Sequence, residues 1–95
     1  MKTVFEMEEV HQLQVQQVSK LICSTQFKKI VLKNKTYTLE AIEHQTYPNT
    51  GLYTVQVWRD GREECKSSGT SDCALHMYLS MFFLNNGPMS GELHS

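Results

Sequence analysis

The sequence lacks the long apolar run that a membrane helix requires. No stretch of its 95 residues approaches the roughly 18 consecutive apolar residues of a membrane span. Acidic residues occupy the N-terminal segment, MKTVFEMEEV, where a secretory signal has its apolar run. We therefore expect a cytoplasmic protein that does not bind a membrane.

An excess of one charge is also missing. Nine basic and ten acidic side chains give a formal net charge of −1, so the whole molecule has no attraction to phosphate.

The cysteines Cys23, Cys65 and Cys73 are odd in number and form no C-x-x-C pair. Such a set is typical of reduced thiols in the cytosol rather than of a disulfide framework.

Common catalytic and cofactor motifs are absent from the sequence. It contains no phosphate-binding glycine loop, dinucleotide fingerprint, serine nucleophile elbow or zinc-protease helix motif. Cys73 and His76 lie three residues apart on one expected helix face, and Cys65 ends the preceding strand. Their C-x7-C-x2-H spacing lacks the close pairs of structural zinc sites. We therefore expect a non-enzymatic protein with no catalytic residue, no bound metal and no cofactor.

A first helix is predicted at the N-terminus. The segment Thr3-Val4-Phe5-Glu6 has the S/T-x-x-E form of a capping box, which predicts that the helix begins there. At about 100° per residue, one broad face of this helix is apolar and the other is rich in glutamine and glutamate. The apolar positions are Met7, Val10, Leu13, Val18, Leu21 and Ile22. We expect the helix to end near Ser24.

From Phe27 onward the pattern changes to that of short strands. β-branched and aromatic residues dominate, and they alternate with polar residues along segments 37–42 and 53–58. Asn34-Lys35 predicts a turn and residues 46–51 predict a loop. Asp60-Gly61 predicts a tight two-residue hairpin, followed by a last strand over residues 62–67.

A second helix is predicted between Ser71 and Gly87. Thr70 or Ser71 supplies the cap, and Gly87-Pro88 ends the helix because proline cannot continue it. We expect one α+β domain over residues 1–87 and a flexible tail over residues 88–95. Its order is α-β-β-β-α, or α-β-β-β-β-α if residues 30–33 form their own strand, with an antiparallel sheet and both helices on one of its faces.

The second helix has scarcely any polar side. Its apolar positions on a helical wheel are Leu75, Tyr78, Leu79 and Phe82, continued by Ala74, Met77, Met81 and Leu84. A narrow polar stripe consists of Asp72, His76 and Ser80. Because one sheet face covers about half of such a helix, either the first helix covers the methionine side or that side binds a partner or a second copy. The candidate protein-binding residues on it are Met77, Met81 and Leu84.

A second candidate surface is the sheet face turned away from the helices. The alternation predicts that Trp58, Gln56 and Ile42 project from it, beside Thr38 and Thr54. Tryptophan is among the residue types most enriched in binding hot spots. Trp58, Gln56 and Ile42 are therefore further candidate protein-binding residues.

Four lysines suggest a different function. Lys28, Lys29, Lys33 and Lys35 lie within eight residues and form a local basic patch. Such a patch could contact several phosphates of a nucleic acid, with steep salt dependence. Lysines on an edge hairpin also serve simply to prevent aggregation, so both interpretations stay open.

A family resemblance rests on the strand Tyr53–Trp58, the hairpin at Asp60-Gly61 and the small residues SSGTS before the second helix. With the α-β-β-β-α order, these features make residues 37–84 resemble a double-stranded RNA-binding domain. In that family, lysines at the start of the second helix hold phosphates across the major groove. The corresponding places here hold Asp72, Cys73 and Ala74. The resemblance therefore implies a scaffold that has turned to protein binding, as some members use their domains for dimerisation.

Together these observations favour a small protein-binding module that occupies the surface of a partner protein as an accessory regulator or inhibitor. The sequence does not identify that partner, and a homodimer is one form of the hypothesis. The small size also fits a phage- or plasmid-type inhibitor of a host system. The alternative is a nucleic-acid-binding protein that uses the hairpin Lys28–Lys35 on a scaffold like that of double-stranded RNA-binding domains.

Overall fold

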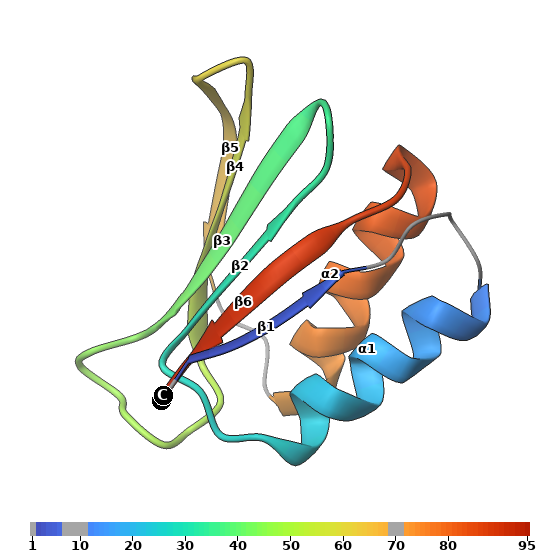
Figure 1. Cartoon of the computed structure of the whole chain (residues 1–95). Helices are drawn as coiled ribbons and strands as arrows, with labels where there is room; N and C mark the ends of the chain where they lie inside the picture. Colours follow the sequence, from blue (N-terminus) through green and yellow to red (C-terminus); the bar gives the residue numbers. More distant parts are fainter. Residues whose placement is uncertain (1, 7–11, 69–71) are drawn as a thin grey trace.

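An antiparallel sheet with helices on one face makes up the fold (Figure 1). The computed structural model describes residues 2–6, 12–68 and 72–95. Within them the elements are β1 (Lys2–Glu6), α1 (Gln12–Ser24), β2 (Lys29–Lys33), β3 (Tyr37–Glu43), β4 (Tyr53–Arg59), β5 (Arg62–Ser68), α2 (Asp72–Asn86) and β6 (Ser90–His94). The strands pair in the order β1-β6-β2-β3-β4-β5, and α1 lies beside α2. The predicted α+β class is confirmed.

The four strands between the helices follow the sequence prediction. Asn34 builds the turn between β2 and β3, because its side-chain oxygen accepts hydrogen bonds from the backbone N–H groups of Thr36 and Tyr37 at 2.9 and 2.7 Å. Asp60 and Gly61 have φ angles of 51° and 76°, the pair of positive values that a tight hairpin requires. Since β2 is a strand of its own, the four-strand form of the prediction is the observed one.

The N-terminal capping-box prediction is wrong. Residues 2–6 form β1, an edge strand that pairs antiparallel with β6 from Lys2 opposite His94 to Glu6 opposite Ser90. A capping box satisfies only two backbone N–H groups, whereas pairing with β6 engages a whole edge of the strand and brings Phe5 against the core. The strand partner lies almost at the other end of the chain, so the local motif could not reveal it.

Helix α1 begins later than predicted and ends where predicted. It spans Gln12–Ser24, and the predicted positions Met7 and Val10 lie outside the described residues. Val18 and Ile22 are buried, together with Val15, which the sequence prediction omitted.

The expected C-terminal tail is a strand instead. Residues 90–94 form β6, which lies between β1 and β2 and pairs with both. Met89 and Leu93 are only 3% and 1% exposed. Two apolar side chains in a short polar segment give a weak local signal, and their burial depends on strands that are remote in sequence.

The core fills the space between the sheet and the two helices. Its residues come from the inner face of the sheet and from the facing sides of α1 and α2. The fully buried side chains include Ile22, Ile30, Leu32, Leu39, Leu75, Leu79, Phe83 and Leu93. Neither described helix is long and apolar enough to cross a membrane.

Candidate functional site

Helix α2 buries the polar residues His76 and Ser80 and exposes apolar side chains. His76 and Ser80 are 4% and 0% exposed, whereas Met77, Tyr78 and Met81 are 46%, 49% and 45% exposed. This arrangement reverses the usual amphipathic helix, whose polar side faces water. These two residues of the predicted polar stripe, which we call the buried stripe, therefore point into the protein.

Hydrogen bonds between the helices account for the buried stripe. The Ser19 hydroxyl of α1 donates to the Ser80 hydroxyl at 2.7 Å, and Ser80 donates in turn to the backbone oxygen of His76 at 3.0 Å. The His76 ring packs against Phe27, with ring centroids 4.8 Å apart. Because the serine hydroxyls are hydrogen-bonded to each other, their burial between the helices costs little.

The apolar side of α2 remains open to solvent. We call Met77, Tyr78 and Met81, with the exposed Ala74, the α2 outer face. The alternative that the first helix covers the methionine side is wrong, because α1 packs against the buried stripe instead. Leu84, which was predicted to belong to this side, is half-buried against the core. Residues 73–86 contain no Asp, Glu, Lys or Arg, so the α2 outer face carries no charge of its own.

The outer face of the sheet carries the other predicted protein-binding residues. Trp58 lies opposite Thr38, and Gln56 lies opposite Glu40, on neighbouring strands. Ile42 is 37% exposed, whereas Trp58 is half-buried. The three residues therefore share a face, but charged groups such as Glu40 are interspersed among them, so the surface is mixed.

The lysine patch is partly neutralised by glutamates of β3. The Lys28 ammonium lies 3.4 Å from the Glu43 carboxylate, and the Lys29 ammonium lies 3.3 Å from the Glu40 carboxylate. Lys33 and Lys35 are exposed. Two of the four lysines thus have an acidic neighbour, which weakens the field that phosphates would meet.

Glu43 also organises the loop between β3 and β4. Its Oε1 accepts a hydrogen bond from the backbone N–H of Asn49 at 2.7 Å. This bond, aided by Lys28 and opposed by burial, holds the pKa of Glu43 below its ordinary value. The carboxylate is therefore a structural link for a loop in which Asn49 itself has a positive φ of 63°.

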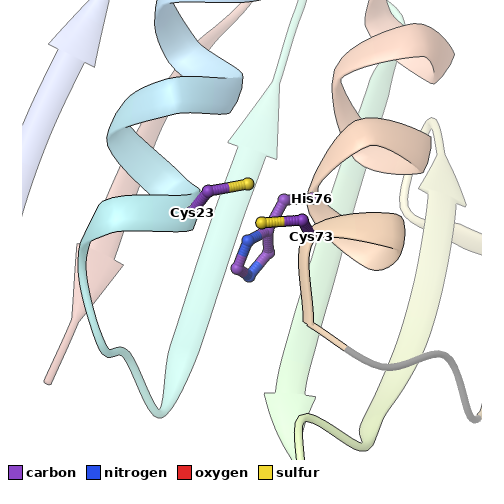
Figure 2. A group of neighbouring side chains, drawn as sticks. All are labelled: Cys23, Cys73 and His76. Atoms are coloured by element: carbon purple, nitrogen blue, oxygen red, sulfur yellow. The ribbon is translucent and has the colours of Figure 1, made fainter.

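A group of potential metal ligands was not predicted from the sequence. Cys23 from the end of α1 meets Cys73 and His76 from the start of α2, and their sulfur and ring nitrogen atoms all lie within 4.8 Å of one another. Figure 2 shows the thiol groups and the imidazole pointing toward one another from the two helices. Sequence spacing suggested Cys65 as the companion of Cys73 and His76, whereas Cys23 lies 50 positions before Cys73. No local sequence pattern indicates that Cys23 lies close to Cys73 and His76.

A cavity of about 490 Å³ adjoins the cluster. Its wall includes Cys23 and His76, as well as Lys28, Glu43 and Tyr53. The Tyr53 hydroxyl donates to the backbone oxygen of Phe27 at 3.2 Å, which fixes the aromatic side of the cavity. The cluster thus borders a space with both polar and aromatic walls.

The likeness to double-stranded RNA-binding domains stays a prediction. The described chain adds β1 and β6 to the α-β-β-β-β-α series, and these strands lengthen the sheet beyond that scaffold. No family model, no curated protein and no solved structure matches this chain.

Proposed function

We propose that this chain is a small protein-binding module that acts through the α2 outer face. It works as an accessory regulator or inhibitor in the cytoplasm by occupying the surface of another protein. The observation that carries the proposal is the exposure of Met77, Tyr78 and Met81, each close to one half, on successive turns of one helix.

The side chains of this face have the properties of a binding surface. Met77 and Met81 are four residues apart and Tyr78 is three residues before Met81, so all three are neighbours on the helix. Methionine adapts its shape to a partner, and tyrosine and methionine are enriched at interfaces. Met77 and Met81 are already about half buried, so covering them in a complex contributes about half of the roughly 1.5–3 kcal/mol that complete burial of a methionine gives, before the costs of association.

The partner we propose is a second copy of the chain. Since residues 73–86 carry no charged Asp, Glu, Lys or Arg side chain, two α2 outer faces can meet across a two-fold axis without like charges opposing each other. Any other partner would need a similarly uncharged apolar surface. The outer face of the sheet fits such a partner less well because ion pairs such as Lys29–Glu40 lie on it.

Light scattering over a range of concentrations tests this proposal. The wild-type chain is expected to form a dimer, and Met77→Glu is expected to dissociate it because a charge would be buried at the interface. Gln17→Glu, which adds the same charge at an exposed position of α1, is the matched control and should leave the dimer intact.

A further variant distinguishes the two surfaces. Trp58→Ala removes the largest side chain from the outer face of the sheet. The mass of the dimer in solution should be unchanged in this variant. Loss of the dimer in Trp58→Ala but not in Met77→Glu would move the interface to the sheet. A wild-type monomer at every concentration would refute pairing through α2.

A further inference from the structure

We propose that Cys23, Cys73 and His76 bind a thiophilic metal ion, zinc in the first instance, with a fourth position open to the adjacent cavity. This site is independent of the α2 outer face and adds a ligand to the protein. The proposal rests on three donor side chains from two helices and on the cavity that adjoins them.

The donor set suits zinc. Zinc is held by cysteine sulfur at about 2.3 Å and by histidine nitrogen at about 2.0–2.1 Å, and two cysteines with one histidine form a known three-ligand combination. Imidazole and thiolate also select zinc and copper over the oxygen-preferring magnesium and calcium ions. The chain supplies these three groups from side chains whose donor atoms lie within 4.8 Å of one another.

The distances require only a small adjustment. In a tetrahedral zinc site, bond lengths of about 2.3 Å place two ligand atoms about 3.5–3.8 Å apart. The donor atoms of the cluster lie within 4.8 Å of one another, so they need to approach each other by about 1 Å to bind the ion. Cys73 is exposed and Cys23 is half-buried, so rotation of their side chains can bring the sulfur atoms inward without displacing the core.

The helices hold the ligands in a stable frame. Cys73 and His76 are three residues apart on α2, which places them on the same side of that helix. Cys23 is next to the last residue of α1. The contact between α1 and α2 therefore sets the position of the third ligand relative to the other two.

The surroundings fix the imidazole and leave access for the ion. His76 is 4% exposed and packs beside the stacked rings of Phe27 and Tyr53, with centroid distances of 4.8 Å to Phe27 and 6.3 Å to Tyr53. The exposed Cys73 leaves a path from solvent. Cys23 and His76 also form part of the wall of the cavity of about 490 Å³.

The fourth position follows from this arrangement. Three protein ligands with an open position are the pattern of zinc sites that bind water or a small ligand, whereas purely structural sites close all four positions. We assign the fourth position to a water molecule that enters from the cavity. The metal-bound thiols lose their protons on binding, so uptake should release protons and weaken in acid.

Cobalt(II) provides a direct probe of this site. The purified, fully reduced chain is titrated anaerobically with Co²⁺, and the expected result is one ion per chain with a thiolate-to-cobalt charge-transfer band and the intense visible bands of tetrahedral cobalt. Zinc should displace the cobalt and abolish both signals. Native mass spectrometry of the zinc form should show one bound ion.

Cysteine variants provide the matched comparison. Cys23→Ser and Cys73→Ser should each weaken binding by more than the roughly 10–100-fold that loss of an outer partner of a metal ligand costs. Cys65→Ser removes one thiol on β5 and should bind cobalt as the wild type does. Circular dichroism of each variant tests whether the fold is kept.

Several outcomes would overturn the proposal. They are the absence of a charge-transfer band in the reduced wild type, an equal loss of binding in Cys65→Ser, and a Cys23–Cys73 disulfide as the sole product with no metal uptake after reduction. Met81→Glu, which alters the α2 outer face, should keep the cobalt spectrum. Failure of the dimer proposal and failure of the metal site can therefore be told apart.

Discussion

The Ser19 hydroxyl donates a 2.7 Å hydrogen bond to the Ser80 hydroxyl in the buried contact between α1 and α2. This bond joins two residues that are 61 positions apart in sequence. Because both side chains are small, the two helices approach closely at this point, and His76 and Ser80 of α2 turn inward. The same rotation of α2 places Met77 and Met81 on its solvent side.

Removing one partner of this pair should destabilise the fold. Ser80→Ala leaves the Ser19 hydroxyl buried without its acceptor, and we expect the free energy of unfolding to fall by about 1–3 kcal/mol. The double variant Ser19→Ala, Ser80→Ala should lose less than the sum of the single variants, because no unsatisfied hydroxyl remains. Urea denaturation measures the free energy of unfolding of the two single variants and the double variant.

Ser24→Ala serves as the control for this cycle. Its hydroxyl donates to the backbone oxygen of Leu21 at an exposed position, so its effect should stay within about 0.5 kcal/mol. Strictly additive effects of the Ser19 and Ser80 substitutions would show that the hydrogen bond does not couple the helices.

Gly91 is predicted to tolerate no side chain. A Cβ at this position would lie 2.5 Å from Leu32 Cδ2, 2.5 Å from Phe5 Cζ and 2.9 Å from the Val31 backbone oxygen. Gly91→Ala should therefore cost about 1–3 kcal/mol through overpacking where β1, β6 and β2 meet. Thermal and urea unfolding are suitable measurements.

The neighbouring substitution Ser90→Ala, at a half-buried position, is the comparison for Gly91→Ala. It should change stability far less because it adds no atom to the crowded side of β6. Equal stability of Gly91→Ala and the wild type would mean that residues 90–94 do not pack in the sheet as described.

Glu43 is expected to make stability fall in acid. Its pKa is lowered in the folded state, chiefly by the backbone N–H of Asn49, below the ordinary value of 4.5. Its contribution is therefore fully present above that ordinary pKa and is lost as the pH falls through the lowered folded pKa. Glu43→Gln should show a flatter dependence of the unfolding midpoint between about pH 6 and about pH 3.

Lys28→Ala separates the contribution of Lys28 to the lowered pKa of Glu43 from that of the Asn49 backbone N–H. It removes the ion pair at 3.4 Å and leaves the bond from the Asn49 N–H in place. Most of the pH dependence should survive in this variant. A curve as flat as that of Glu43→Gln would assign the effect to the lysine instead.

Asn34 should stabilise the turn and its contact with α2. Besides accepting two backbone hydrogen bonds within the turn, its Nδ2 donates to the backbone oxygen of Asn86 at 2.8 Å. Asn34→Ala loses all three bonds and should lower stability by about 1–2 kcal/mol. Lys35→Ala, at the next and exposed turn position, should be nearly neutral in the same denaturation experiment.

Much of the fold could be predicted from local signals. The hairpin at Asp60-Gly61 follows from the positive φ angles that this pair accepts, and the end of α2 follows from Gly87, whose φ is 109°. The alternation from Tyr53 to Trp58 set the inner and outer sides of β4, which the burial pattern matches. These features depend on residues close together in the chain.

The candidate sites could be predicted only in part. The excess of apolar residues on α2 predicted an unusual helix, and Met77 and Met81 do lie on its open side. Which side would be open depended on how α1 docks. Cys23 gave no signal at all, because its neighbours in the cluster come from another helix.

By itself the sequence determined the α+β class, the central strands, the turns and the end of α2, because turn residues, caps and residue periodicity act within a few positions. Only the tertiary structure decided that the two ends of the chain pair as β1 and β6, that α2 turns His76 and Ser80 inward, and that Cys23 meets Cys73 and His76. Each of these depends on contacts between segments far apart in the chain. Such contacts are selected by the packing of the whole core, and no local pattern specifies them.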